Sequence, residues 1–151
     1  MGIFEASVLM CLNVLAGDET FGIVSTGKVW EAGLTMAVNK FLGMGEDGEE
    51  KVLGGRFSGC ETTGLNASEL HDLLAEEVRT KMKDATMRLL KQGDWKLDAI
   101  CHGCAGMVGL DDAVREACVE ELGEEKGQDI RIVDGVKAGV ALLFASARGG
   151  F

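Results

Sequence analysis

The sequence predicts an α/β fold with a mostly parallel sheet of about four strands flanked by helices. Four short apolar segments alternate with longer amphipathic segments along the 151 residues, and this alternation is typical of βαβ units. Hydrophobic residues make up 46% of the chain and charged residues 26%, a balance that supports a packed core. The length fits one ordinary domain.

The first part of the chain predicts two helices and two strands. Apolar residues recur at helical spacing over 3–15, so this segment predicts a helix. "TFGIVST", residues 20–26, predicts a buried strand, and residues 55–64 predict a second strand and its exit. Residues 29–43 between them predict a helix. Five of its side chains should face inward: Trp30, Leu34, Ala37, Val38 and Phe41.

A long helix is expected after the second strand. Asn66 can cap its start, and Glu69, three residues later, completes an arrangement like a capping box. An apolar stripe continues at helical spacing for several turns. The stripe consists of Leu70, Leu73, Leu74, Val78, Met82, Ala85 and Leu89. Because the stripe is continuous, we expect one uninterrupted helix.

The remaining elements complete the alternation. "KLDAIC", residues 96–101, predicts a third strand, and a helix is expected over about 108–122. Residues 123–128, "GEEKGQ", are a candidate break. "DIRIV", residues 129–133, predicts a fourth strand, and residues 134–147 predict the last helix. This order predicts a three-layer, Rossmann-like lobe with helices on both faces of the sheet.

Composition excludes several function classes. The formal net charge is −10, which disfavours nucleic acid and anionic membrane surfaces because both need clustered Lys and Arg. No apolar run approaches the roughly 20 residues of a membrane span. The N-terminal segment lacks the basic start of a signal peptide. Five cysteines without a disulfide framework favour a reducing, cytoplasmic setting.

The ends of the predicted strands carry small and polar residues. The first strand ends in Ser25-Thr26-Gly27, the second in Thr62-Thr63-Gly64, and the fourth in Asp134-Gly135; the third runs into residues 102–106, "HGCAG". In open parallel sheets, ligands bind at the carboxyl ends of the strands. Short turns are also built from Gly, Ser and Thr for conformational reasons alone. The four ends together nevertheless favour a binding crevice for a carboxylate or an imide carbonyl.

Cys101 and Cys104 form a Cys-x-x-Cys pattern that has three interpretations. If the strand stays extended, their Cα atoms stand about 10 Å apart, whereas a disulfide needs less than about 7 Å. A zinc site would need a second ligand pair, and the other histidine, His71, lies on a helix, so we expect no metal. Cys104 remains as a thiol at a strand-to-helix turn, where a helix N-terminus lowers the pKa of a thiol. Such a thiolate can act as a general base or nucleophile.

The other cysteines are expected to be structural. Cys101 should be a buried small hydrophobic residue, and Cys11 and Cys118 should lie in helix cores. Cys60, late in the second strand, is expected to be structural, although it could approach the same crevice.

"LDAICHGCAGMVGL", residues 97–110, resembles the second cysteine motif of the Asp/Glu/hydantoin racemase superfamily, in its hydantoin and allantoin racemase-like branch. The most specific part is Gly-Cys-Ala-Gly-Met, residues 103–107. Four further segments resemble family segments in the same order. They are "GIFEASV" at 2–8, "FGIVSTGKVWE" at 21–31, "RFSGCETTGLNASELH" at 56–71 and "IRIVDGVKAGVALL" at 130–143.

The resemblance implies two α/β lobes with an active site between them and cofactor-independent proton transfer at a carbon next to a carbonyl. It implies one thiol from each lobe, of which Cys104 is the second. It implies that Ser25 and Thr26 hold the substrate carboxylate or ring carbonyl. Thr63, Gly103 and Ala105 would line the same pocket. The implied substrate is an amino-acid derivative or a hydantoin.

Compared with the family pattern, we expect that these 151 residues lack the first lobe and its cysteine. Residues 1–127 are expected to form the second lobe. Residues 128–151 would normally complete the first lobe. Here that strand and helix could attach to the lobe's own sheet edge, pack loosely or pair between chains, and a homo-oligomer is possible.

The leading hypothesis is a racemase- or epimerase-like isomerase that uses Cys104 as acid and base and is impaired when alone. The alternative is a non-catalytic, truncated homologue that binds small carboxylates or assembles with another chain. Thiol redox chemistry through Cys101 and Cys104 is a third, weaker hypothesis.

Overall fold

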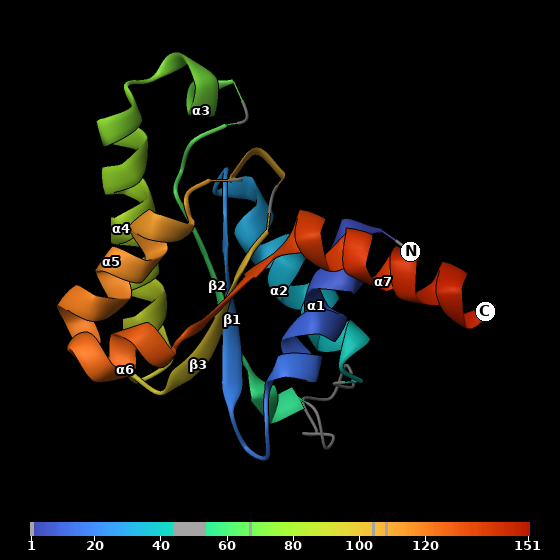
Figure 1. Cartoon of the computed structure of the whole chain (residues 1–151). Coiled ribbons are helices and arrows are strands. Elements are labelled where there is room, and N and C mark those ends of the chain that lie inside the picture. Colours follow the sequence, from blue (N-terminus) through green and yellow to red (C-terminus); the bar gives the residue numbers. More distant parts are fainter. Residues whose placement is uncertain (1, 44–53, 67, 104, 108) are drawn as a thin grey trace.

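A computed structural model describes residues 2–43, 54–66, 68–103, 105–107 and 109–151, and its strands form one parallel sheet (Figure 1). The sheet order is β2-β1-β3-β4, and each neighbouring pair is parallel. The strands are β1 (Thr20–Ser25), β2 (Phe57–Thr62), β3 (Leu97–His102) and β4 (Arg131–Asp134). The predicted α/β class, with helices flanking a four-stranded parallel sheet, is confirmed.

Helices cover both faces of the sheet, as Figure 1 shows. One face carries α1 (Ile3–Val14), α2 (Val29–Phe41) and α7 (Gly135–Gly149). The opposite face carries α4 (Ala75–Gln92), α5 (Asp111–Leu122) and α6 (Glu124–Asp129). Three short elements connect them: the 3₁₀ turns η1 (Gly54–Arg56) and η2 (Ala105–Met107), and the helix α3 (Glu69–Asp72). Among the described residues, every helix is too short or too polar to cross a lipid bilayer.

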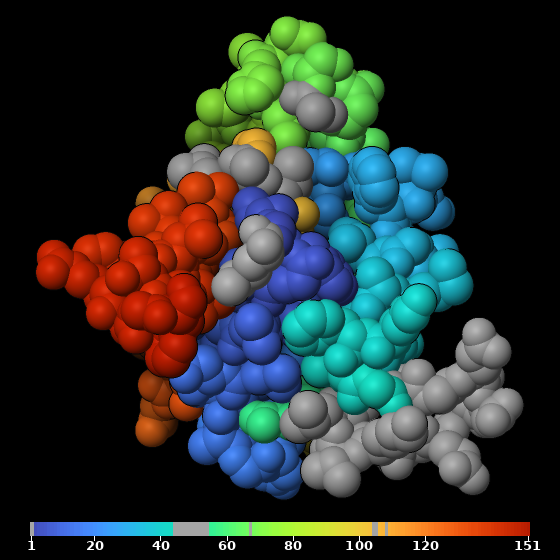
Figure 2. All heavy atoms as spheres, turned by 90° about the vertical axis from the view of Figure 1, so that its right-hand side faces the viewer, coloured from blue at the N-terminus to red at the C-terminus, as the bar shows by residue number. Residues whose placement is uncertain are grey.

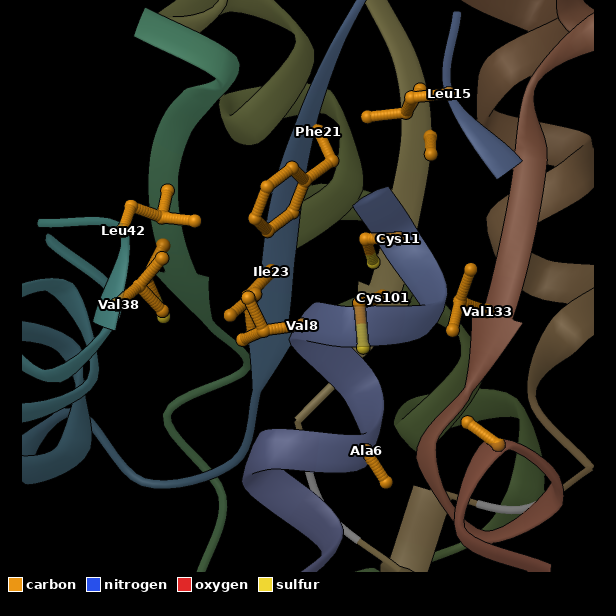
Figure 3. Close-up of a cluster of buried hydrophobic side chains, with 13 residues drawn as sticks. Ala6, Val8, Cys11, Leu15, Phe21, Ile23, Val38, Leu42, Cys101 and Val133 are labelled. Carbon is orange, nitrogen blue, oxygen red and sulfur yellow. The ribbon is translucent and has the colours of Figure 1, made fainter. Parts of the chain in front are cut away.

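Each face of the sheet has its own hydrophobic core, because successive strand residues point to opposite faces. Toward α1, the strand residues Phe21, Ile23 and Cys101 pack with Val8 and Cys11 (Figure 3). Toward α4 and α5, a second cluster combines strand and helix residues. It includes Val24, Leu97, Ile100, Met82, Leu89 and Val114.

Gly22 lets α4 approach β1 closely. A Cβ atom placed on Gly22 would lie 2.8 Å from Leu89 Cδ1. A larger residue there would force the buried Leu89 side chain to shift, so glycine allows the second core to pack this closely.

The helix expected after β2 is interrupted. Its capping box is present, because Asn66 N donates to Glu69 Oε2 at 2.8 Å and Glu69 N donates to Asn66 Oδ1 at 3.0 Å. However, α3 ends at Asp72, and Leu73 and Leu74 are extended, with ψ angles of 159° and 139°. The prediction of one continuous helix was wrong because the chain turns here, beyond the end of the sheet (Figure 1).

The predicted apolar stripe is correct only from the point where α4 lies over the sheet. Val78, Met82 and Leu89 are buried, whereas Leu74 is 79% exposed. Before that point Leu70 and Leu73 have no strand beneath them and are only half-buried.

Two aromatic residues of α2 were also wrongly expected to face inward. Trp30 is 58% exposed and Phe41 is 40% exposed, while Val38 is fully buried. This helix covers the β1–β2 edge of the sheet, where only a narrow stripe of it finds apolar partners. Phe41 contacts Phe4 of α1 edge-on, with 6.0 Å between the ring centroids.

The C-terminal elements join the same sheet. β4 pairs with β3 from Ala99↔Arg131 to His102↔Asp134, and α7 packs on α1. Of the three arrangements considered for residues 128–151, the structure therefore shows attachment to the sheet's own edge. The proposed break over 123–128 is instead the helix α6, and the helix expected from about 108 begins at Asp111. The division into units 1–127 and 128–151 stays a prediction.

Candidate functional site

The carboxyl ends of β1, β2 and β3 lie side by side because the strands are parallel. Thr63 N donates to Ser25 O at 2.9 Å, Gly64 N to Thr26 O at 3.0 Å, and Gly103 N to Val24 O at 2.8 Å. Four residues singled out from the sequence, Ser25, Thr26, Thr63 and Gly103, are therefore brought together. Their role in substrate binding stays a prediction.

The hydroxyl groups at this edge are buried and partly engaged. Thr63 Oγ1 donates to Thr26 O at 3.3 Å and accepts from Leu65 N at 3.3 Å. Ser25, Thr26 and Thr63 are all buried. Gly103 is packed tightly, because a Cβ atom there would lie 2.9 Å from Ile23 Cγ2 and 3.1 Å from Ser25 Oγ. The backbone groups named here are therefore used within the fold, and the edge is tightly packed around Gly103.

The thiol of Cys104 and the side chain of Ala105 lie outside the described residues. Ala105 begins the 3₁₀ turn η2, and the long helix α5 starts only at Asp111. A helix dipole acts within about one turn of the helix end. The long helix α5 therefore begins too far from residue 104 for its dipole to lower the pKa of the Cys104 thiol, and only the 3₁₀ turn η2 follows that residue directly.

The four described cysteines are free and buried, so the predicted burial of Cys101 is confirmed, and a purely structural role for the four stays a prediction. Cys101 points toward α1 and lies beside Cys11 (Figure 3). The pKa of the Cys11 thiol is raised far above its ordinary range. The larger cause is a hydrogen bond with Cys101, and burial is the second. Burial likewise raises the pKa of Cys60 to about 12 and that of Cys118 to about 11. These thiols stay protonated at neutral pH, and the inward position of Cys101 disfavours a redox pair.

A polar cluster lies at the ends of β3 and β4, and we call it the His102 cluster: His102, Asp111, Asp134 and Lys137. His102 is only 2% exposed, and its Nδ1 lies 3.4 Å from Asp111 Oδ1. Lys137 Nζ lies 3.3 Å from Asp111 Oδ2 and 3.9 Å from Asp134 Oδ2. Asp134 Oδ1 caps α7 by accepting from Val136 N and Lys137 N at 2.8 and 3.0 Å.

Several polar atoms of the His102 cluster lack hydrogen-bond partners among the described residues. They are both ring nitrogens of His102, Asp111 Oδ1 and Asp134 Oδ2. Burial lowers the pKa of His102, and this effect outweighs the opposing influence of Asp111 and Asp134. The sequence indicated the two strand ends, but gave His102 no role. The available signal was a histidine at the end of a strand that is apolar except for Asp98.

A cavity of about 530 Å³ lies where the chain leaves β2 and β3. It is lined by Leu70, His71, Leu73, Ala75, Val78, Arg79, Gly106, Gly109 and Leu110. This volume is within the range of small-molecule sites. Within the described ranges, no group of three or more His, Cys, Asp and Glu residues could hold a metal ion.

Comparison with known proteins gives a family assignment. The sequence profile described as Asp/Glu/hydantoin racemase matches residues 1–143. "Uncharacterized protein C1F7.10" of Schizosaccharomyces pombe (strain 972 / ATCC 24843) is 31% identical over 147 residues, which are 97% of this chain and 52% of that protein. The chain thus spans about half the length of this curated relative. No solved structure matches significantly.

Proposed function

Because the chain belongs to the Asp/Glu/hydantoin racemase family, we propose that it transfers protons at a carbon next to a carbonyl. The proposed substrates are amino-acid derivatives such as hydantoins, and the reaction needs no cofactor. Cys104 is the proposed acid and base. The thiolate takes the α-proton, and the C–H electron pair moves onto the carbonyl oxygen to form an enolate. Return of a proton to the opposite face then gives the inverted product.

The observation that carries this proposal is the cluster of strand ends around Gly103. Thr63 N donates to Ser25 O and Gly103 N donates to Val24 O, and Cys104 follows Gly103 in the sequence. Hydroxyls that are fixed in advance, such as those of Ser25 and Thr26, can stabilise an enolate oxygen. The family profile covers this edge, and it supports racemase-like chemistry there.

Inversion needs a proton donor on each face of the substrate carbon, and Cys104 can serve only one. The match covers 52% of the S. pombe relative. We therefore propose that polypeptide corresponding to the rest of that relative supplies the second donor. It could belong to the same protein or to another chain. The free, buried cysteines support a cytoplasmic setting for this chemistry.

Deuterium wash-in at C5 of a 5-substituted hydantoin tests the proposal without requiring inversion. Exchange by wild type is compared with exchange by Cys104→Ala and Cys101→Ala, followed by mass spectrometry. We expect a loss of about 100-fold or more for Cys104→Ala, which is the usual scale of general acid–base catalysis. Cys101→Ala is the matched control, because Cys101 is buried against α1. Equal exchange by Cys104→Ala and wild type would refute the role of the thiol.

A second candidate function is assembly with another chain, without catalysis by this chain alone. Helix α7 projects from the body of the molecule (Figure 2). Its outer side exposes Val140, Leu143 and Phe144 by 63%, 59% and 62%. A groove of about 240 Å³ runs between α7 and Ile3 of α1. Large exposed apolar patches mark interaction sites.

The occupant we propose for this face is the polypeptide corresponding to the remaining half of the relative. Co-expression with that half of C1F7.10 followed by sedimentation velocity tests the assembly. Wild type should form a one-to-one complex, and Leu143→Asp should not. Exchange activity that appears only in the complex would unite the two proposals. A homodimer of this chain that Leu143→Asp dissociates would assign the face to a second copy. A binder of small carboxylates would show saturable binding of a hydantoin without exchange.

A further inference from the structure

The chain segment that contains Cys104 begins and ends at two residues that face each other. His102 ends β3 and Asp111 begins α5, and residues 103–110 connect them. His102 Nδ1 and Asp111 Oδ1 are 3.4 Å apart. Gly103 N is tied to Val24 O at 2.8 Å. The two ends of the segment are therefore joined by the contact between His102 and Asp111. Its first residue, Gly103, is also bonded to β1.

The polar contact between His102 and Asp111 is too long for an ordinary hydrogen bond. Its 3.4 Å is longer than an ordinary N–H···O bond, which is about 2.9 Å. Buried polar groups without partners are rare in folded proteins. Here four such atoms, on His102, Asp111 and Asp134, occur together among the described residues. A small movement of Asp111 toward His102 would satisfy two of them at once.

Charged groups reach His102 from three elements. Asp111 comes from α5, Asp134 from β4 and Lys137 from α7. Lys137 is a neighbour of both carboxylates. Burial lowers the pKa of His102, which keeps the imidazole neutral at pH 7. A neutral imidazole can donate through one nitrogen only, so it can fasten Asp111 in one position.

We propose that His102 is a positioning residue whose contact with Asp111 fixes the base of segment 103–110 and thereby the reactivity of the thiol it carries. This inference rests on the proposed function of Cys104. We call the contact between His102 and Asp111 the clasp. Lys137 of α7 pairs with Asp111, so the C-terminal helix also supports this segment. Nothing in this arrangement requires His102 to touch the substrate.

Two variants with a matched control test the clasp. His102→Leu removes both ring nitrogens, and Asp111→Asn weakens the partner without loss of size. Asp112→Asn is the control, because it makes the same change in the first turn of α5 at a residue that is exposed. His102→Gln keeps one donor and should restore part of the lost function. Circular dichroism melts show whether each variant folds. If His102→Leu does not fold, Asp111→Asn alone tests the role of the contact.

Two readouts separate positioning from a purely structural role. The first is the pH profile of iodoacetamide alkylation at Cys104, resolved by mass spectrometry. The second is kcat and KM for deuterium wash-in. We expect the alkylation profile to shift and kcat to fall by about tenfold or more with KM little changed, because a misplacement of about 1 Å can cost about 100-fold. Asp112→Asn should match wild type in both.

Unchanged alkylation profiles and kcat in folded His102→Leu or Asp111→Asn would overturn the clasp. If Cys104→Ala abolishes exchange in that case, the proposed function stands and only this inference fails. If Cys104→Ala exchanges like wild type, the proposed function fails. The alkylation profiles then still decide whether His102 controls the segment.

Discussion

The two halves of the sheet's carboxyl edge differ in how they use their polar groups. At β1 and β2, the backbone groups of Ser25, Thr26 and Thr63 bond to each other, and the Thr63 hydroxyl is engaged. At β3 and β4, His102 and Asp134 are equally buried, yet they keep polar atoms without partners among the described residues. The first half uses its backbone groups and the Thr63 hydroxyl within the fold, whereas the second combines charge with buried side-chain atoms that lack partners among the described residues. This contrast indicates that the adaptable chemistry of the edge lies at β3 and β4.

Gly103→Ala should produce the largest effect, because it disturbs the junction between the two halves. The new Cβ atom would lie 2.9 Å from Ile23 Cγ2 and 3.0 Å from Ser25 Cβ. Overpacking of this kind costs about 1–3 kcal/mol of unfolding free energy. Urea denaturation measures the loss, and Gly109→Ala is a poor comparison because Gly109 has a φ of 89°. An unchanged denaturation midpoint would show that Ile23 and Ser25 of β1 can move to accommodate the added methyl group.

Asp134→Ala should have the next largest effect, because it removes the cap of α7. Asp134 Oδ1 accepts from two backbone N–H groups of that helix, and the loss of an N-cap costs about 1 kcal/mol. Asp134→Asn keeps an acceptor oxygen and should recover most of the stability. Thermal melts of the two variants give the comparison. Equal destabilisation by both would assign the effect to the lost charge instead of the cap.

The pH dependence of stability should separate the two halves of the edge. Because burial lowers the pKa of His102 below its ordinary 6.5, the unfolded chain binds a proton at a higher pH than the folded chain does. The free energy of unfolding should therefore fall as the pH drops below about 6.5, down to the folded pKa. His102→Gln should lose this part of the pH dependence. Denaturation curves between pH 7.5 and pH 5 test it, and identical slopes for both proteins would contradict it.

Thr63→Val should have the smallest effect. It removes the two hydrogen bonds of Thr63 Oγ1, to Thr26 O and from Leu65 N, which are both long at 3.3 Å, so the expected loss is about 0.5 kcal/mol of unfolding free energy. Thr63→Ser keeps the hydroxyl and is the control. A larger loss of unfolding free energy for Thr63→Val than for Asp134→Ala would show that the Thr63 hydroxyl stabilises the fold more than its long hydrogen bonds indicate.

Sequence patterns predicted the parallel sheet because each strand is apolar and ends in small polar residues. They placed Ser25, Thr26, Thr63 and Gly103 at one edge for the same reason. They failed where position relative to the sheet decides burial: Leu74 continues the apolar stripe of α4 but lies beyond the sheet. Periodicity cannot show where a helix stops covering a sheet.

The polar cluster could not be predicted, because its members are separated along the chain. Asp111 and His102 are brought together by the short crossover from β3 to α5, and Asp134 faces His102 through the register of β4. No local pattern encodes that register. The start of α5 at Asp111 was also missed, because the glycines before it delay the helix.

The most direct test of the account compares deuterium wash-in by wild type, Cys104→Ala and Cys101→Ala on one 5-substituted hydantoin, with and without the polypeptide corresponding to the rest of the relative. Without that polypeptide, the account predicts exchange by wild type and Cys101→Ala and its loss in Cys104→Ala; with it, wild type should also invert the substrate, whereas Cys104→Ala should not. Exchange by Cys104→Ala alone at the wild-type rate would contradict it.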